Sequence, residues 1–505
     1  MIEELISHLL TGFGVALTAK NIFWCTVGVT LGTLIGVLPG LGPAATLAML
    51  LPLTFNFPPV TALIMLAGIY YGSQYGGSTT AIMVNLPGEA SSVVTCLDGY
   101  SMARQGRGGP ALAMAALASF FAGCFGILLI ALFGPPLAEL ALTFSSAEYF
   151  ALMVMGLLVA AIIAQGPLIK AIGMVLLGLL LGLVGMDVNS STLRFTFGIP
   201  ELHDGIGFAL LAMGLFGYSD IIANLELREK YNSVTSKIQG LIPSWSDFRD
   251  SFKPMLRGTA VGSVLGILPG AGPIISSFVS YSVEKRIAAD PSRFGKGAIE
   301  GVAAPEAANN ASAQTAFIPL LTLGIPVTGT MALMLGAMMI HGIAPGPEVM
   351  TKYPDLCWGL VASMWIGNLM LVLLNLPLIG VWIRLLTISY RFVYPAILLF
   401  CCIGAYSLNN RPLDVALAGG FGLLGYIFTK LDCEPAPLLL GFILGPLMET
   451  HLRRAMLLSR GDPTVFFTRP ISLGILLATG LSLFLAIISA VRRKRKEKGG
   501  MLAPG

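Results

Sequence analysis

A proline–glycine interruption occurs twice inside long apolar runs of this chain. Gly36–Pro43 reads Gly-Val-Leu-Pro-Gly-Leu-Gly-Pro, and Gly266–Pro273 reads Gly-Ile-Leu-Pro-Gly-Ala-Gly-Pro. Proline removes a backbone donor and crowds the preceding turn, and glycine lowers helix propensity. Broken backbone at membrane depth is tolerated only where protein buries it or where it lines a polar cavity. The two breaks therefore predict interrupted helices around a polar site.

Composition places these breaks in a membrane. The 505 residues are 55% hydrophobic and only 11% charged, with a mean hydropathy of +0.82, whereas soluble domains have about 25% charged residues. We expect an all-α polytopic integral membrane protein with about 12 transmembrane helices, some of them paired as broken or re-entrant helices. Ala44–Leu53 and Val60–Tyr70 are too short to span alone, so we interpret them as half-helices.

The sequence shows no enzyme signature. It has no GxxxxGK loop followed by Ser or Thr and no HExxH motif, and its seven cysteines and four histidines are scattered without metal-ligand spacing. We therefore expect neither an enzyme nor an organic cofactor, and no nucleic-acid partner.

The spacing of these features predicts two related halves. The second break follows the first by a little under half the chain, and the interval from Ser73 to Pro87 equals the interval from Ser312 to Pro326. A matched pair of interrupted helices is typical of transporters built from repeats, and we expect an inverted repeat. The expected division is a first membrane repeat at 1–225, a hydrophilic linker at 226–257, a second repeat with additional C-terminal spans at 258–491, and a basic cytoplasmic tail at 492–505.

The breaks are candidate anion-binding elements. A helix that begins after Pro-Gly-x-Gly-Pro exposes unsatisfied N–H groups and a partial positive charge. Few lysines or arginines lie within the apolar segments, so an anion there would be held by backbone and hydroxyl groups. The candidate residues are Gly40, Gly42, Gly270 and Gly272. The alternative is that these glycines serve only the close crossing of helices.

Small and hydroxyl-bearing residues follow each break and extend the candidate substrate site. Their donors can bind carboxylate oxygens, and their oxygens, with freed carbonyls at helix ends, can coordinate Na⁺. The alternative is that they satisfy backbone groups at the breaks. The candidates are Ser73, Gly76, Gly77, Ser78, Thr79, Thr80, Asn85, Asn309, Asn310, Ser312, Thr328 and Gly329.

Acidic residues beside these stretches are candidates for cation coupling. An ionisable group at membrane depth is by default a functional candidate, and Glu89 and Glu306 have that position. The alternative places Glu300 and Glu306 in a solvated loop after Lys296. The basic run after residue 491 predicts a cytoplasmic C-terminus.

Several longer matches, all in one order, give the chain a family resemblance. It resembles TctA, the large permease subunit of the bacterial tripartite tricarboxylate transporters, over nearly its whole length. The resemblance rests on Gly36–Pro43, Gly266–Pro273, Tyr70–Ile82, Asn85–Glu89, Ala304–Ala311, Gly441–Pro446, Arg453-Arg454, Gly461–Pro463 and Thr468–Pro470.

This resemblance implies a multi-pass secondary importer of tricarboxylates or related organic carboxylate anions in the bacterial cytoplasmic (inner) membrane. It implies a TctB-like small membrane subunit, a TctC-like periplasmic solute-binding protein, and coupling to a Na⁺ or H⁺ gradient. The alternatives are an organic-anion channel and a stand-alone secondary carrier.

Overall fold

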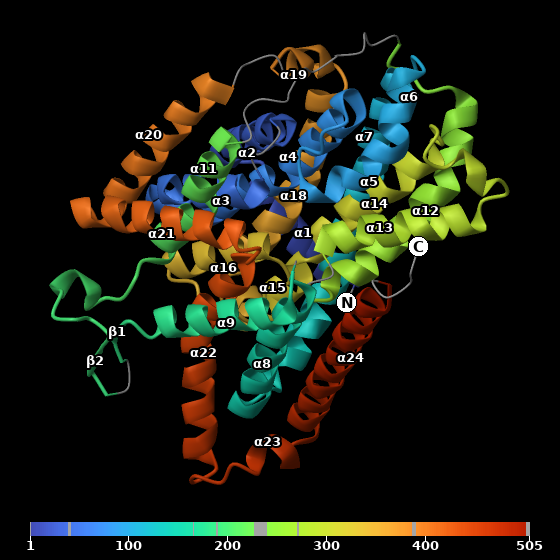
Figure 1. The fold of residues 1–505 in the computed structure, drawn as a ribbon. Helices are drawn as coiled ribbons and strands as arrows, with labels where there is room; N and C mark the ends of the chain where they lie inside the picture. Colours follow the sequence, from blue (N-terminus) through green and yellow to red (C-terminus); the bar gives the residue numbers. More distant parts are fainter. Residues whose placement is uncertain are drawn as a thin grey trace. The chain divides into compact units, whose positions relative to one another are not determined.

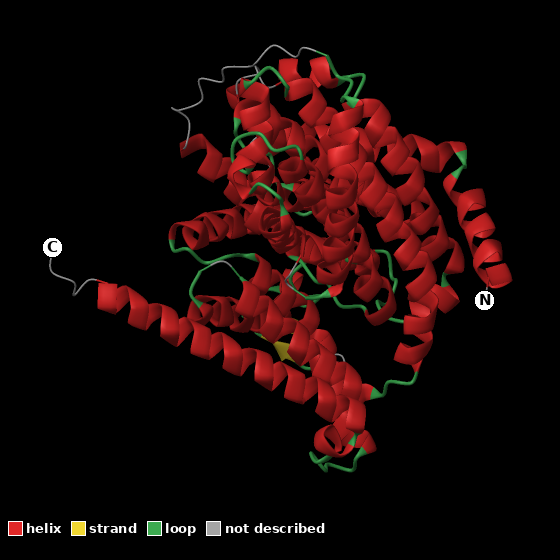
Figure 2. Ribbon diagram, turned by 90° about the vertical axis from the view of Figure 1, so that its right-hand side faces the viewer, coloured by secondary structure: helices red, strands yellow, loops and turns green. Residues whose placement is uncertain are grey.

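The computed structural model describes residues 2–38, 42–164, 166–187, 190–226, 240–269, 272–385 and 390–500, and these are almost entirely helical (Figures 1 and 2). The chain divides into two compact units. Met1–Leu142 with Ala209–Tyr426 form the first, and Thr143–Phe208 with Ile427–Gly505 form the second. Both predicted halves thus contribute to the first unit.

The N-terminal part of the first unit holds the first break. Its elements are α1 (Ile2–Ala16), α2 (Ala19–Val37), α3 (Pro43–Leu50), η1 (Pro52–Asn56), α4 (Pro59–Val84), η2 (Ala90–Ser92), α5 (Val93–Thr95), η3 (Cys96–Tyr100), α6 (Ser101–Arg104) and α7 (Gly108–Leu142).

The later part of the first unit holds the second break. Its elements are α10 (Phe208–Ala212), η5 (Met213–Tyr218), α11 (Ser219–Glu226), α12 (Trp245–Ile267), α13 (Gly272–Ile287), η6 (Pro291–Arg293), α14 (Glu300–Thr315), α15 (Phe317–Leu323), α16 (Gly329–Ile340), α17 (Glu348–Lys352), α18 (Pro354–Asn375), α19 (Ile379–Leu385), α20 (Tyr390–Asn409) and α21 (Pro412–Lys430). The end of the stretch predicted as a hydrophilic linker is therefore the start of α12.

The second unit is built on four longer helices. Its elements are α8 (Ser146–Ile163), α9 (Leu168–Gly182), β1 (Gly185–Met186), β2 (Leu193–Arg194), η4 (Pro200–Leu202), α22 (Ala436–Leu458), α23 (Val465–Thr468) and α24 (Pro470–Gly500). β1 and β2 pair antiparallel. Within this unit α22 packs on α9, where a Cβ added at Gly178 would lie less than 3.0 Å from the Leu438 carbonyl oxygen.

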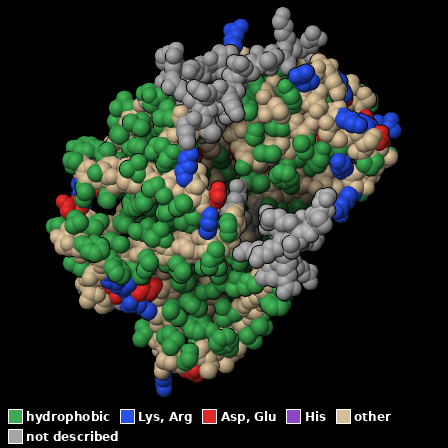
Figure 3. All heavy atoms as spheres, viewed as in Figure 1, with side chains coloured by type: hydrophobic (Ala, Val, Ile, Leu, Met, Phe, Trp, Pro, Cys, Tyr) green, Lys and Arg blue, Asp and Glu red, His purple; other side chains and the backbone are tan. Residues whose placement is uncertain are grey.

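Length and composition qualify five of the described helices as membrane spans. They are Ala19–Val37, Gly108–Leu142, Pro354–Asn375, Pro412–Lys430 and Pro470–Ile488. Large apolar side chains are exposed on such helices, for example Leu477 and Phe484 of α24, and hydrophobic side chains cover much of the face in Figure 3. A surface of this kind fits lipid rather than water. The protein is therefore an all-α, multi-pass membrane protein.

Both breaks interrupt helices where the sequence predicts. α2 ends at Val37 and α3 begins at Pro43, and α12 ends at Ile267 and α13 begins at Gly272. The central break residues Pro39–Leu41 and Gly270-Ala271 lie outside the described residues. The half-helix interpretation of Val60–Tyr70 is wrong, because α4 continues unbroken from Pro59 to Val84. Its small polar residues face protein on all sides, so the helix can tolerate them.

A stripe of glycines on α2 brings that helix into backbone contact with α4. A Cβ added at any of them would lie less than 3.0 Å from a carbonyl oxygen of α4. Small residues at every fourth position permit this close approach of two helices. The pairs are Gly28 with Met65, Gly32 with Ile69 and Gly36 with Ser73.

The second half repeats this contact between α12 and α14. An added Cβ would again lie less than 3.0 Å from a carbonyl oxygen of the partner helix. The pairs are Gly258 with Ala304, Gly262 with Ala308 and Gly266 with Ser312. Each glycine of α12 lies the same number of residues after its counterpart on α2. Each partner residue on α14 likewise lies a second, constant number of residues after its counterpart on α4.

The start of α12 is fixed by a capping box and an ion pair. Ser244 and Asp247 exchange side-chain and backbone hydrogen bonds, and Arg107, at the start of α7, pairs with Asp247. Burial by itself raises the pKa of Asp247, but the Ser244 hydroxyl and N–H and the Arg107 guanidinium outweigh it and hold that pKa below its usual range.

Candidate functional site

The predicted polar stretches lie in two helices of the first unit that are buried almost all round. A helix buried on every side belongs to the interior of a large protein, so polar groups there must find protein partners or a ligand. The predicted residues on α4 are Ser73, Gly76, Gly77, Ser78, Thr79 and Thr80, and those on α14 are Asn309, Asn310 and Ser312.

The remaining predicted residues lie at helix ends. Asn85 ends α4 in the left-handed conformation, with φ 58°. Gly42 precedes α3, and Gly272 opens α13 with φ 46°. Thr328 caps α16 by accepting the Met331 N–H at 3.2 Å, and Gly329 is the first residue of that helix. Gly40 and Gly270 lie outside the described residues.

Glu89 is at the centre of the first polar cluster. The Asn309 side-chain amide donates to Glu89 Oε1 at 3.2 Å. The Ser91 hydroxyl contacts the same oxygen and also lies 3.0 Å from Gln74 Oε1. A Cβ added at Gly77 would lie 2.7 Å from the Glu89 side chain, so glycine is needed there for the close approach.

Glu306 is at the centre of the second polar cluster. The Ser78 hydroxyl donates to its Oε2 at 2.6 Å, and the Thr95 hydroxyl donates to its Oε1. The Ser119 hydroxyl lies 3.4 Å from Oε2 and accepts the Asn310 side-chain amide at 2.7 Å. Hydroxyls from α4, α5 and α7 thus converge on a carboxylate of α14. Glu306 is in a buried helix, so the alternative of a solvated loop is wrong for it.

Both carboxylates are buried and have only neutral partners. Glu89 is 8% exposed and Glu306 is 1% exposed. Among the described residues, no lysine or arginine forms an ion pair with either of them. A buried charge without a counter-charge is costly, so each carboxyl group is suited to bind a proton or a metal cation. Glu300, in contrast, pairs with Arg293 at 3.1 Å.

The two clusters join the predicted halves reciprocally. Glu89 of the first half accepts from Asn309 of the second, and Glu306 of the second half accepts from Ser78 and Thr95 of the first. Any movement of one half against the other would change the ligands of both carboxyl groups.

The backbone freed at the first break is satisfied by Thr80. Its hydroxyl lies 3.3 Å from the Gly36 carbonyl oxygen and 3.1 Å from that of Val37. For this residue the structure shows the backbone role that the sequence left as an alternative. At the second break a Cβ on Gly272 would lie 2.9 Å from the Thr328 methyl group, so these two candidates do lie together.

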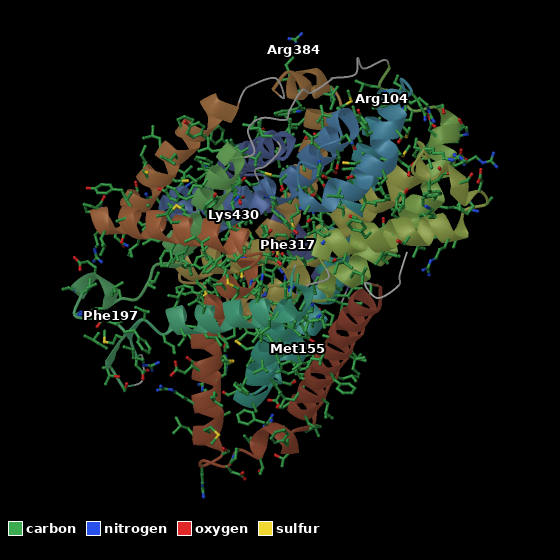
Figure 4. The ribbon with its side chains drawn as sticks, viewed as in Figure 1. Arg104, Met155, Phe197, Phe317, Arg384 and Lys430 are labelled. Atoms are coloured by element: carbon green, nitrogen blue, oxygen red, sulfur yellow. The ribbon has the colours of Figure 1, made fainter. Side chains whose placement is uncertain are left out.

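A small pocket lies beside the Glu306 cluster, between α4, α7 and the α18–α19 region. Its lining is Tyr75, Ser78, Thr79, Leu112, Ala115, Ala116, Ser119, Asn375 and Ile379. In the same unit, Phe317 is fully buried (Figure 4) and packs on Tyr70 with ring centroids 6.3 Å apart.

Sequence reasoning missed Thr95, Ser119 and Asn375. Ser119 is an isolated polar residue in an apolar stretch of α7, and Asn375 is the last residue of α18, which also contains Ser363 and Asn368. A polar side chain within an apolar segment is the one signal that points to them. Thr95 has no such signal, because it lies in a short mixed segment after the conspicuous Pro87-Gly88.

The interrupted apolar helices surround a buried centre of polar and acidic residues. The molecule is thus a multi-pass helical membrane protein with polar groups in its interior. The chain belongs to the tripartite tricarboxylate transporter TctA family, whose model matches residues 22–440. It is therefore the large subunit of a tripartite transporter and not an enzyme. The family works in general with TctB and TctC partners.

Two curated relatives come from Agrobacterium vitis. The chain is 58% identical, over 98% of both chains, to the "Uncharacterized 52.8 kDa protein in TAR-I ttuC' 3'region". It is also 58% identical to the "Uncharacterized protein in TAR-II ttuC' 3'region", over 47% of this chain and 98% of that one. No solved structure matches the chain.

Proposed function

We propose that this chain imports tricarboxylates or related organic carboxylate anions across the bacterial inner membrane, driven by a Na⁺ or H⁺ gradient. A TctC-like periplasmic binding protein delivers the anion, and a TctB-like small membrane subunit accompanies the chain. Family membership supports the substrate class and the partners. The observation on which the coupling rests is the pair of buried carboxyl groups, Glu89 and Glu306, each held by hydroxyl and amide groups alone.

Cation coupling follows from electrostatics in the buried centre. Two ionised carboxylates without counter-charges would oppose the entry of an anion, because charge interactions are strong in a medium of low polarity. A cation at either carboxylate removes that opposition. Binding of the cation and binding of the carboxylate substrate then favour one another, and this mutual dependence is what a symporter requires.

The substrate site of this proposal lies at the two breaks. The N–H groups that follow Pro43 in α3 and Pro273 in α13 are available to an anion, and Thr328, the N-cap of α16, lies against Gly272 at the start of α13. Replacing Gly40 or Gly270 with leucine is expected to abolish uptake while the protein still inserts. Wild-type uptake by both variants would contradict a site at the breaks.

Alternating access in this proposal comes from two inverted repeats within about 12 spans. The repeated glycine stripes support the duplication, and so do the helix ends that follow. Asn85 and Gly324 both end a helix in the left-handed conformation. After the same short interval, each of these helix ends is followed by a helix N-cap. These N-caps are Glu89, with φ/ψ of −142°/165°, and Thr328, with φ/ψ of −139°/164°.

The inversion can be tested by topology mapping. Single cysteines at Gly42 and Gly272, in a chain without its native cysteines, should react with a membrane-impermeant thiol reagent from opposite sides of the membrane. Labelling of both from the same side would exclude an inverted relation.

The function is tested by reconstitution of the complete three-component system in liposomes, with sodium and pH gradients imposed separately. We expect saturable uptake of a carboxylate only when the binding protein is present and one gradient is imposed. Full-rate saturable uptake by this chain alone would identify a stand-alone carrier. Unsaturable flux without a gradient would identify a channel.

A further inference from the structure

The polar groups that line the pocket beside Glu306 and could bind a ligand there are oxygen atoms. Tyr75, Ser78, Thr79 and Ser119 contribute hydroxyls, and Asn375 contributes a side-chain amide. The Asn375 Nδ2 already donates to the Leu371 carbonyl oxygen at 2.9 Å. Among the described residues that line the pocket none is basic, so no positive charge of the lining would oppose a cation.

One of these oxygens is buried and has no partner. Asn375 is 4% exposed, and its Oδ1 makes no hydrogen bond within the described part of the chain. Native proteins rarely leave a buried acceptor unpaired, and such an atom calls for a bound water, ion or ligand. Asn310 Oδ1 also has no hydrogen-bond partner among the described residues. The side-chain amide of Asn310 donates to the pocket-lining Ser119.

The Glu306 carboxyl group lies directly behind this lining. The Ser78 hydroxyl donates to Glu306 Oε2 at 2.6 Å, and Ser119 lies 3.4 Å from the same oxygen. A hydroxyl oxygen keeps lone pairs free while its proton is donated. Ser78 can therefore donate to the carboxylate and at the same time offer a lone pair to a cation in the pocket, and each interaction polarises the other.

We infer that this pocket is a Na⁺ site, in which Ser78, Ser119 and Asn375 supply oxygen ligands and Glu306 supplies the compensating charge. Hydroxyl, amide and carboxylate oxygens are the ligands that hard cations prefer. The inference rests on the proposed cation-coupled import and assigns the cation to one of the two carboxylates. Glu306 contacts the lining residues Ser78 and Ser119, whereas the contacts of Glu89 are with Ser91 and Asn309, which do not line the pocket.

Ser73 provides a matched control for Ser78 on the same helix. Both hydroxyls are buried and both contact a carbonyl oxygen of their own helix, that of Tyr70 at 2.7 Å for Ser73 and that of Gln74 at 3.1 Å for Ser78. Only Ser78 also donates to Glu306 and lines the pocket. Loss of either hydroxyl changes side-chain volume and helix propensity equally. A difference between Ser78→Ala and Ser73→Ala therefore reports on the pocket.

The experiment measures carboxylate uptake against sodium concentration, at fixed pH, by the complete reconstituted system. Ser78→Ala and Asn375→Leu should each raise the half-saturating sodium concentration about tenfold, as loss of one good ligand would. Ser73→Ala should leave it unchanged. At saturating sodium, the half-saturating carboxylate concentration should remain that of the wild type in Asn375→Leu, because Asn375 is not among the candidate substrate residues.

Direct binding of radioactive sodium to the purified chain provides a second readout that does not require transport. Glu306→Gln should lose this binding while Glu89→Gln retains it. The inference is overturned if Glu306→Gln binds sodium normally, or if Ser78→Ala shifts the carboxylate dependence instead of the sodium dependence. Uptake driven by a pH gradient alone would also overturn it while leaving the proposed import intact. Uptake that responds to neither gradient would refute the proposed import itself.

Discussion

The buried carboxylate of Asp98 allows a quantitative prediction about how the two halves are joined. Asp98, in η3, is 0% exposed. Its Oδ1 accepts the backbone N–H groups of Gly295, Gly297 and Ala298 at 2.9, 2.8 and 2.8 Å, and its Oδ2 accepts the Tyr281 hydroxyl at 2.9 Å. One side chain of the first half thus satisfies the whole turn that leads into α14.

Because the two oxygens of Asp98 have different partners, substitutions can separate the contributions of its hydrogen bonds and of its charge to the free energy of unfolding. Asp98→Ala leaves four donors without an acceptor, and because a buried donor left unsatisfied costs about 1–3 kcal/mol, we expect a total loss of at least about 3 kcal/mol. Asp98→Asn keeps an oxygen for the three backbone N–H groups and loses mainly the charge, which predicts a cost of about 1–2 kcal/mol. Tyr281→Phe removes one bond of four and should cost about 1 kcal/mol.

The assay is unfolding of the purified protein in detergent, together with hydrogen exchange of the amides of residues 295–298. We expect Asp98→Ala to show the largest loss of stability and fast exchange at these amides, while Asp98→Asn keeps the amides protected. If Asp98→Asn unprotects them as strongly as Asp98→Ala does, charge rather than acceptor geometry holds the turn. A loss below about 0.5 kcal/mol for Asp98→Ala, the level of an ordinary surface substitution, would refute the reasoning.

Two further predictions concern packing and pH. Gly32→Ala and Gly262→Ala should both lower the melting temperature, because each added Cβ would lie less than 3.0 Å from a carbonyl oxygen. The control is Gly420→Ala, where a Cβ would meet open space and should stabilise the helix by about 1 kcal/mol. A loss in only one of the first two would contradict equivalent packing in the halves. Because the pKa of Asp247 is lower in the folded state, its contribution to stability is complete above its unfolded pKa of about 4 and is lost as the pH falls through the folded pKa. Hydrogen exchange in the first turn of α12 should therefore accelerate in acid, and Asp247→Asn should remove that dependence on pH.

The sequence by itself determined the environment of this protein and the positions of its breaks. Hydropathy and the scarcity of charge are properties of the chain alone, and the two prolines and two glycines of a Pro-Gly-x-Gly-Pro segment strongly disfavour a continuous helix. α2 and α12 accordingly end at Val37 and Ile267. The same local reasoning identified Glu89 and Glu306 as acids in unusual surroundings.

Only the tertiary structure decided what each polar residue does. Ser73, Ser78 and Thr80 look alike along α4, and each hydroxyl contacts a carbonyl oxygen of its own helix. Ser78 also bonds Glu306, however, and Thr80 also satisfies carbonyl groups of α2. The short apolar segment Val60–Tyr70 predicted a half-helix, but α4 is continuous from Pro59 to Val84 and packs closely against α2.

The physical reason is the separation of the partners along the chain. Ser119 lies 187 residues from Glu306 and Asn309 lies 220 residues from Glu89, so no local pattern can pair them. Propensity and hydropathy act over one or two turns of helix. The partner of a buried carboxylate depends on which helix faces it, and that is settled by the packing of all the helices together.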